Sequence, residues 1–285
     1  MPDNTDDKTL FNLERAYSSL PKEFMGYERS RVSPVGGSRH GVRRMGDFFL
    51  EKTGTPDGAL SLKEWFFVPE QALAEATNGK IFRDDLGDFS DSRKRLSYFP
   101  EDVRLKKLAG NLLLMGQAGQ YNYSRCLERN EAAAAQLSVV EFVKSAINVI
   151  FLLNKKYQPY YKWSFKALRE LDNLSDLHYN LEYLISSGNS AGEQIKKKEI
   201  IENICNEIFK ELKADIGCEL ADLVAVLFEV FAEGFEVVGL GGDVDVMNLV
   251  EEEALSGGVA LGGGLDVLAV HRGARVHHHR HQVHR

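Results

Sequence analysis

Cysteine is scarce in this sequence. Three cysteines, Cys126, Cys205 and Cys218, are scattered through 285 residues without a CxxC pair. This excludes a disulfide scaffold and indicates reduced thiols, as in a cytoplasmic protein.

The sequence also lacks segments that direct a chain into or across a membrane. Residues 1–7 are acidic and contain no apolar run, so they are not a signal peptide. The longest apolar stretch, residues 139–153, is interrupted by Glu141, Lys144 and Asn148. We expect this stretch to be too short and too polar to span a bilayer, and we expect no membrane partner.

Positive charge is not in excess. The formal net charge is −7, and residues 216–285 hold eleven acidic side chains against four arginines. In the rest of the chain the charges balance, 31 against 31. The charge pattern therefore indicates no nucleic-acid partner.

What the sequence does contain is a series of apolar side chains at helical spacing. In residues 100–115 they recur every three or four positions, and Pro100 stands at the start, which predicts a helix. Further helices are predicted over residues 8–20, 69–78, 90–98, 130–155, 159–170, 175–188 and 190–213. The short connections between them favour antiparallel neighbours in a bundle.

Residues 31–50 show a different pattern, in which valine, methionine and phenylalanine are mixed with glycine. One or two strands with a turn are predicted there. Within this segment, residues 36–41 (GGSRHG) could hold a phosphate on backbone amides with Arg39 nearby, or they could form a hairpin turn. Asp47 could be a metal carboxylate on one of the strands.

The expected fold is mostly α. An antiparallel helical bundle over residues 56–215 follows a small α/β remnant at residues 1–55 and precedes a poorly structured tail at residues 216–285. The tail contains no Lys, Thr, Tyr, Pro or Trp and is rich in Gly, Val and His. Residues 219–232 could form an apolar helix, but the repeated Gly-Gly units that follow are not typical of a packed fold. An out-of-frame reading would explain the change, and sequencing the gene around the Cys218 codon tests that hypothesis.

Residues 116–125 (GQAGQYNYSR) contain two glycines, which predict the end of the preceding helix. A loop here could present amides, phenols and a guanidinium to the phosphate or base of a ligand. The same side chains could instead tie down a loop between two helices, because buried polar groups need partners.

Residues 152–163 (LLNKKYQPYYKW) interleave lysines with aromatic rings. This composition can stack bases and neutralise phosphate. Alternatively, Tyr160 with Trp163, or Tyr157 with Tyr161, pack at helical spacing while the lysine stems lie along the surface. In the ligand-binding interpretation, we expect residues 121–125 and 155–163 to converge on one cleft.

Several short motifs give the sequence a resemblance to the domain-of-unknown-function 4037 family. They are RHGV at residues 39–42, GDFF at 46–49, PE at 69–70, TNG at 77–79, PEDVRLKK at 100–107, GQYNY at 119–123 and LLNKKYQPYYKW at 152–163. Their order and number make the resemblance specific, and it covers about residues 20–213.

The resemblance implies a role beside a nucleotidyltransferase-like domain, which usually precedes the helical domain in that family. Such a domain carries Gly-Ser on a turn and Asp-x-Asp on a strand, and its carboxylates hold a metal ion for nucleotidyl transfer. No such motif precedes residue 20 here. We therefore expect no catalytic residue, cofactor or metal in this chain and no activity from it alone, although the family context implies a nucleotide and Mg²⁺.

Two functions follow as expectations. The first is an accessory, substrate-binding helical domain of a nucleotidyltransferase-like protein, which binds a nucleotide or a nucleotide-bearing substrate. The second is a non-catalytic interaction module that pairs with a separately encoded nucleotidyltransferase domain or another protein. The candidate ligand-binding residues are Arg39, Gln120, Tyr121, Asn122, Tyr123, Arg125, Asn154, Lys155, Tyr157, Tyr160, Tyr161, Lys162 and Trp163.

Overall fold

The computed structural model describes residues 1–29 and 40–217. The predictions for Arg39, for most of the GGSRHG segment and for the tail therefore lie outside the described residues.

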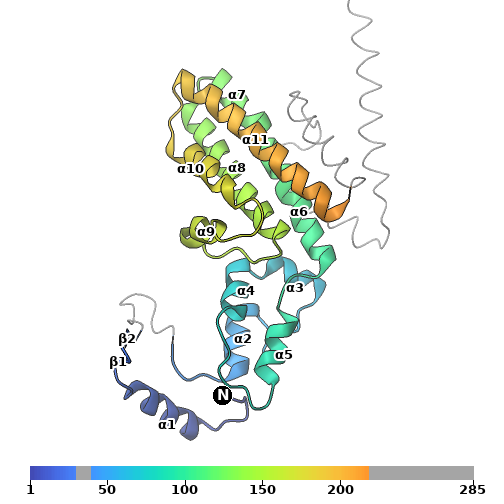
Figure 1. The fold of residues 1–285 in the computed structure, drawn as a ribbon. Helices are drawn as coiled ribbons and strands as arrows, with labels where there is room; N and C mark the ends of the chain where they lie inside the picture. Colours follow the sequence, from blue (N-terminus) through green and yellow to red (C-terminus); the bar gives the residue numbers. More distant parts are fainter. Residues whose placement is uncertain (30–39, 218–285) are drawn as a thin grey trace, which may run out of the picture. The chain divides into compact units, whose positions relative to one another are not determined.

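The described part of the chain is mostly α, as predicted (Figure 1). Two short strands, β1 (Glu23–Phe24) and β2 (Tyr27–Glu28), pair antiparallel. The helices are α1 (Asp7–Ser18), α2 (Met45–Thr53), α3 (Leu62–Phe67), α4 (Glu70–Thr77), α5 (Asp88–Arg95), α6 (Glu101–Met115), the π-helix η1 (Gly116–Asn122), α7 (Tyr123–Glu128), α8 (Ala132–Leu153), α9 (Tyr161–Leu168), the 3₁₀ turn η2 (Ser175–Leu177), α10 (His178–Ser186) and α11 (Ala191–Ile216).

The bundle is built around α8, which packs against α6, η1, α7, α9, α10 and α11 (Figure 1). With 22 residues, α8 is about 33 Å long. Arg104 and Asn111 of α6 bond to Leu152 and Asn148 of α8 in reverse order, so these two helices are antiparallel. The end of α10 and the start of α11 both contact Gln136 near the start of α8. The direction of the chain therefore alternates from each helix to the next along α6, α8, α10 and α11.

Apolar faces of these helices form the core, as their periodicity predicts. The buried side chains of α6, α8 and α11 include Leu108, Leu112, Val139, Phe142, Val143, Ala146, Ile150, Ile201, Ile204, Ile208 and Leu212. Each buried Leu, Ile, Val or Phe side chain contributes about 1.5–3 kcal/mol relative to its exposed state.

α8 begins at Ala132, before the apolar stretch 139–153, and within the described residues this longer helix is long and apolar enough to cross a membrane by length and composition. In the fold, however, 61% of its most apolar window is buried against protein. That burial is what the core helix of a soluble protein shows.

The predicted strands at residues 31–50 are wrong where the chain is described. Met45–Thr53 forms α2, because Met45, Phe48 and Phe49 stand at the i, i+3, i+4 spacing of a helix, and Phe49 is buried. Asp47 therefore lies on a helix, with its carboxylate 4.0 Å from the Arg44 guanidinium.

The two short strands occur earlier in the chain. They are joined at Met25 and Gly26, which both have positive φ, and this matches the twist of a tight hairpin turn.

The prediction that α6 ends in a loop at Gly116 is also wrong. The backbone continues helically through η1 into α7. Gly119 serves close packing here, because a Cβ at this position would lie 2.4 Å from Phe142 Cδ2 and 3.0 Å from Ile201 Cγ2.

Candidate functional site

The two candidate segments lie at opposite ends of α8 (Figure 1). The Tyr123 hydroxyl donates to Asn189 Oδ1 at 3.1 Å, and Asn189 Nδ2 donates to the carbonyl of Ala132, the first residue of α8, at 3.3 Å. Residues 154–163, by contrast, follow the last residue of α8. Because about 33 Å of helix separates these ends, the prediction of one shared cleft is wrong.

At the first end, the polar side chains bond within the protein. Gln120 Nε2 donates to Glu202 Oε2 at 2.8 Å. The Arg125 guanidinium donates to the Tyr121 hydroxyl and lies 4.8 Å from the centroid of that ring. Tyr123 is fully buried, and burial raises its pKa to about 12. These contacts are those expected of side chains that join η1 and α7 to the bundle, and Asn122 beside them is half-buried.

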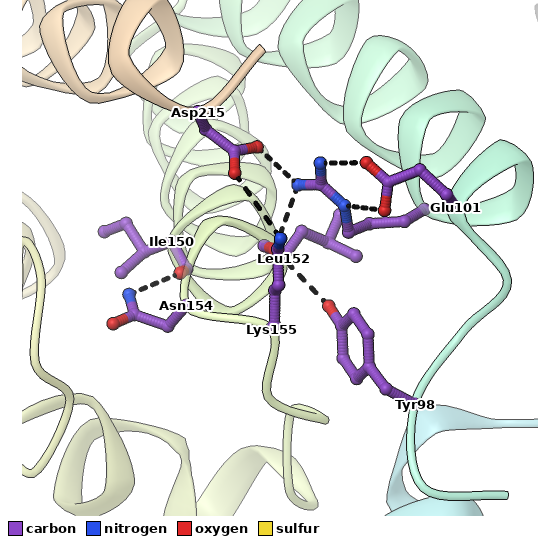
Figure 2. A network of polar contacts seen from close by, with 8 residues as sticks. Tyr98, Glu101, Ile150, Leu152, Asn154, Lys155 and Asp215 are labelled. Atoms are coloured by element: carbon purple, nitrogen blue, oxygen red, sulfur yellow. Dashed lines mark hydrogen bonds and ion pairs between the residues drawn. The ribbon is translucent and has the colours of Figure 1, made fainter.

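At the other end, Asn154 closes the turn that follows α8. Its Nδ2 donates to the Ile150 carbonyl at 2.8 Å (Figure 2). The same Nδ2 donates to the Asn173 carbonyl at 2.9 Å, and Oδ1 accepts from the Asn173 amide at 2.9 Å. These three hydrogen bonds to backbone groups indicate a structural role for the Asn154 side chain.

Lys155 belongs to a charged network where α6, α8 and α11 meet. Figure 2 shows Glu101, Asp215 and Lys155 together around the end of α8. Arg104, which is 1% exposed, donates through Nε to Glu101 at 2.9 Å and through Nη1 to Asp215 at 2.6 Å. Lys155 Nζ lies 3.9 Å from the second Asp215 oxygen. Two carboxylates thus compensate one buried guanidinium, as a buried charge requires.

Tyr157 is also committed to the fold. Its hydroxyl donates to the Leu96 carbonyl at 2.9 Å, and its ring lies 5.3 Å from that of Tyr98 and 5.0 Å from that of Phe99. Burial raises its pKa. The Tyr157 ring therefore packs against other rings of the fold, but against Tyr98 and Phe99 rather than against Tyr161, the partner named in the alternative to ligand binding.

Tyr160, Tyr161 and Trp163 differ, because their rings are 41%, 72% and 54% exposed. The Tyr160 and Tyr161 rings lie 4.4 Å apart, and the Lys162 ammonium is 5.8 Å from the ring centroids of both Tyr160 and Trp163. Packing in the core therefore does not account for these three rings. They form an exposed aromatic surface with a cation beside it.

A cleft of about 340 Å³ opens next to this surface, between the start of α4 and the start of α9. Its volume is at the small end of the range for ligand pockets. It is lined by Pro69, Glu70, Gln71, Asn148, Gln158, Pro159, Tyr160 and Tyr161. We call it the Glu70 cleft.

Glu70 supplies the carboxylate of the cleft. Its Oε2 accepts from the Gln158 backbone amide at 3.2 Å, and its Oε1 lies 3.9 Å from Lys107 Nζ. Burial raises the pKa of Glu70 and lowers that of Lys107, with each charge partly offsetting the effect on the other. Perturbed ionisable groups beside a concave surface are typical of functional sites.

The sequence interpretation missed Glu70, Gln71, Asn148 and Gln158. Asn148 was visible as a polar interruption of the apolar face of α8, and Gln158 lies inside a candidate segment. Glu70 could not be linked to them, because it lies 88 positions before Gln158 in the chain.

The resemblance places the magnesium site of the family on the nucleotidyltransferase-like domain and not on the helical domain. In residues 1–29 and 40–217, no group of three His, Cys, Asp or Glu side chains could hold a metal ion.

Comparison with known proteins links part of this chain to a family. Residues 65–164 match the family described as "Domain of unknown function (DUF4037)". This segment includes α4, α6, α8 and the whole Glu70 cleft. Searches of the curated proteins and of the solved structures found no match.

Proposed function

We propose that this chain supplies the accessory, substrate-binding helical domain of a nucleotidyltransferase-like protein, since residues 65–164 match the DUF4037 family. In this role the Glu70 cleft binds a nucleotide or a nucleotide-bearing substrate. A nucleotidyltransferase-like domain performs the transfer. No catalytic step is assigned to the side chains described here.

The exposed aromatic surface beside the cleft is the observation that carries the proposal. Tyr160 and Tyr161 line the cleft with largely solvent-accessible rings, and Trp163 follows on the same helix. An aromatic face binds a nucleobase by stacking, with about 1–3 kcal/mol per base. Lys162 lies beside these rings, where it can meet a phosphate at the edge of the cleft.

Tryptophan fluorescence tests the proposal, because the sequence contains two tryptophans. Trp65 is 5% exposed and packs against Phe99, whereas Trp163 is exposed. The variant Trp65→Phe leaves Trp163 as the reporter. Addition of ATP, CTP, GTP or UTP is expected to change its emission with at least one of the four, and Tyr161→Ala is expected to weaken that binding by about 1–3 kcal/mol.

Tyr179→Ala is the matched control, because Tyr179 on α10 is 69% exposed and does not line the cleft. It is expected to leave the titration unchanged. A folded sample that responds to none of the four nucleotides would refute nucleotide binding.

The second candidate function is a non-catalytic interaction module, and the N-terminal residues favour it. Phe11, Phe24, Met25 and Tyr27 are 67–81% exposed, and α1 contains no buried residue. Apolar groups left in solvent are typical of a surface that a partner covers. Co-purification with a nucleotidyltransferase-like partner, lost on Phe24→Ser with Tyr27→Ser but retained in Tyr161→Ala, would support this function.

A further inference from the structure

From the lining of the Glu70 cleft, we infer which part of a substrate it takes: a hydroxyl-rich ring without phosphate, such as the ribose of a nucleoside or a free sugar. The inference rests on the proposed function and specifies the substrate class for the same site.

The lining is rich in hydrogen-bonding groups and poor in positive charge. It offers the Glu70 carboxylate, the side-chain amides of Gln71, Asn148 and Gln158, and two phenols. Among the described residues that line the cleft, none is a lysine or arginine. Phosphate recognition depends on cations or on clustered backbone amides, whereas hydroxyl recognition uses carboxylates and amides.

Lys107 and Lys162, whose ammonium groups contact residues of the cleft lining, do not change this balance. Lys107 pairs with Glu70 at 3.9 Å, so its charge is directed to the carboxylate. Lys162 lies beside the outer rings, 5.8 Å from the Tyr160 centroid. A phosphate would therefore meet Lys162 outside the cleft, while the ring lies inside it.

The Glu70 carboxylate is oriented for hydrogen bonding to such a ring. One of its oxygens accepts from the Gln158 amide, so the carboxylate is oriented before a ligand arrives, and a carboxylate retains further acceptor sites for hydroxyl donors. Its side chain is 19% exposed, which leaves it accessible from the cleft. Pro69, Pro159 and the tyrosine rings provide apolar faces for the carbon side of the ring.

The test uses the full chain carrying Trp65→Phe and the emission of Trp163. Four probes are titrated: ATP, adenosine, sucrose and inorganic pyrophosphate. Adenosine is expected to bind within about threefold of ATP, since each threefold is only about 0.7 kcal/mol. If a free sugar fits the cleft, sucrose is expected to displace ATP. If the ribose of a nucleoside is required, only adenosine is expected to displace ATP. Pyrophosphate is expected to displace neither.

Substitutions test whether adenosine binds at the Glu70 cleft. Glu70→Gln keeps the shape of the side chain and is expected to weaken adenosine binding at least tenfold. Glu182→Gln, on an exposed carboxylate that pairs with Arg169 at 2.7 Å, is expected to change it less than twofold. If Glu70→Gln fails to fold, Gln71→Ala gives the same test from an exposed lining residue.

The outcomes separate the inference from the proposed function. ATP binding with no adenosine binding, together with displacement by pyrophosphate, would overturn the inference and leave the proposed function standing. Adenosine binding that Glu70→Gln does not weaken would also overturn it. If no probe binds to a folded chain, the proposed function itself fails.

Discussion

Arg104 carries a buried charge where three helices meet. It bonds to Glu101 on its own helix, to Asp215 near the end of α11, and to the Leu152 carbonyl at the end of α8 at 3.5 Å. That carbonyl lies in the last turn of α8, where it also accepts from the Lys155 backbone amide at 3.2 Å, and a cation at this end interacts favourably with the helix dipole. Arg104 therefore stabilises the cleft end of the bundle without touching a ligand.

Arg104→Met is expected to destabilise the chain by about 3–5 kcal/mol, because it leaves the largely buried Asp215 carboxylate with only the more distant Lys155 ammonium, at 3.9 Å, as its cation. Urea unfolding followed by circular dichroism measures the loss. Arg83→Met is the matched control: its side chain is 83% exposed, and the expected change is within about 0.5 kcal/mol. An Arg104→Met variant as stable as that control would contradict the structural role assigned to this network.

At the scale of elements, the π-helix η1 is stabilised by packing rather than by the helix propensity of its residues. Its glycines would favour a chain end on propensity alone. Gly116, Ala118 and Gly119 are nevertheless buried, and the missing side chain of Gly119 lets η1 approach α8 and α11 closely. A π-helical turn inserts one residue into the register and is often found at functional sites.

Gly119→Ala tests this packing. The added methyl would meet Phe142 at 2.4 Å, so the variant is expected to lose about 1–3 kcal/mol of stability through overpacking. Gly192→Ala is the matched control, because no atom lies within 4 Å of its added Cβ in the first turn of α11. It is expected to be neutral or to stabilise by up to about 1 kcal/mol. Thermal unfolding of the two variants compares them directly, and equal stability would contradict close packing at η1.

Element types followed from the sequence where periodicity and caps agreed. The helices predicted over residues 100–115 and 190–213 are present as α6, which starts after Pro100, and α11, which starts with a Ser190–Glu193 capping box. Met45, Phe48 and Phe49 stand at the i, i+3, i+4 spacing of a helix, and the segment forms α2 with Phe49 buried. The strand prediction failed there because it followed the mixture of apolar residues and glycines rather than this spacing.

For the whole molecule, the direction and length of α8 determine which candidate residues can act together. Tyr123 and Trp163 were grouped from their composition, but a 22-residue helix places their segments at its two ends. Glu70 joins the second group through a hydrogen bond to Gln158, a contact between distant segments that a single sequence cannot supply. Composition identified the exposed aromatic rings, and only the fold identified the carboxylate beside them.

The central claim is that ligand binding takes place at the Glu70 cleft and not at the η1 end of α8. Amide hydrogen exchange of the full chain, with and without saturating ATP, tests it most directly. Protection is expected in peptides covering residues 69–71 and 158–163 and not in those covering residues 116–128. Protection confined to residues 116–128 would contradict the claim.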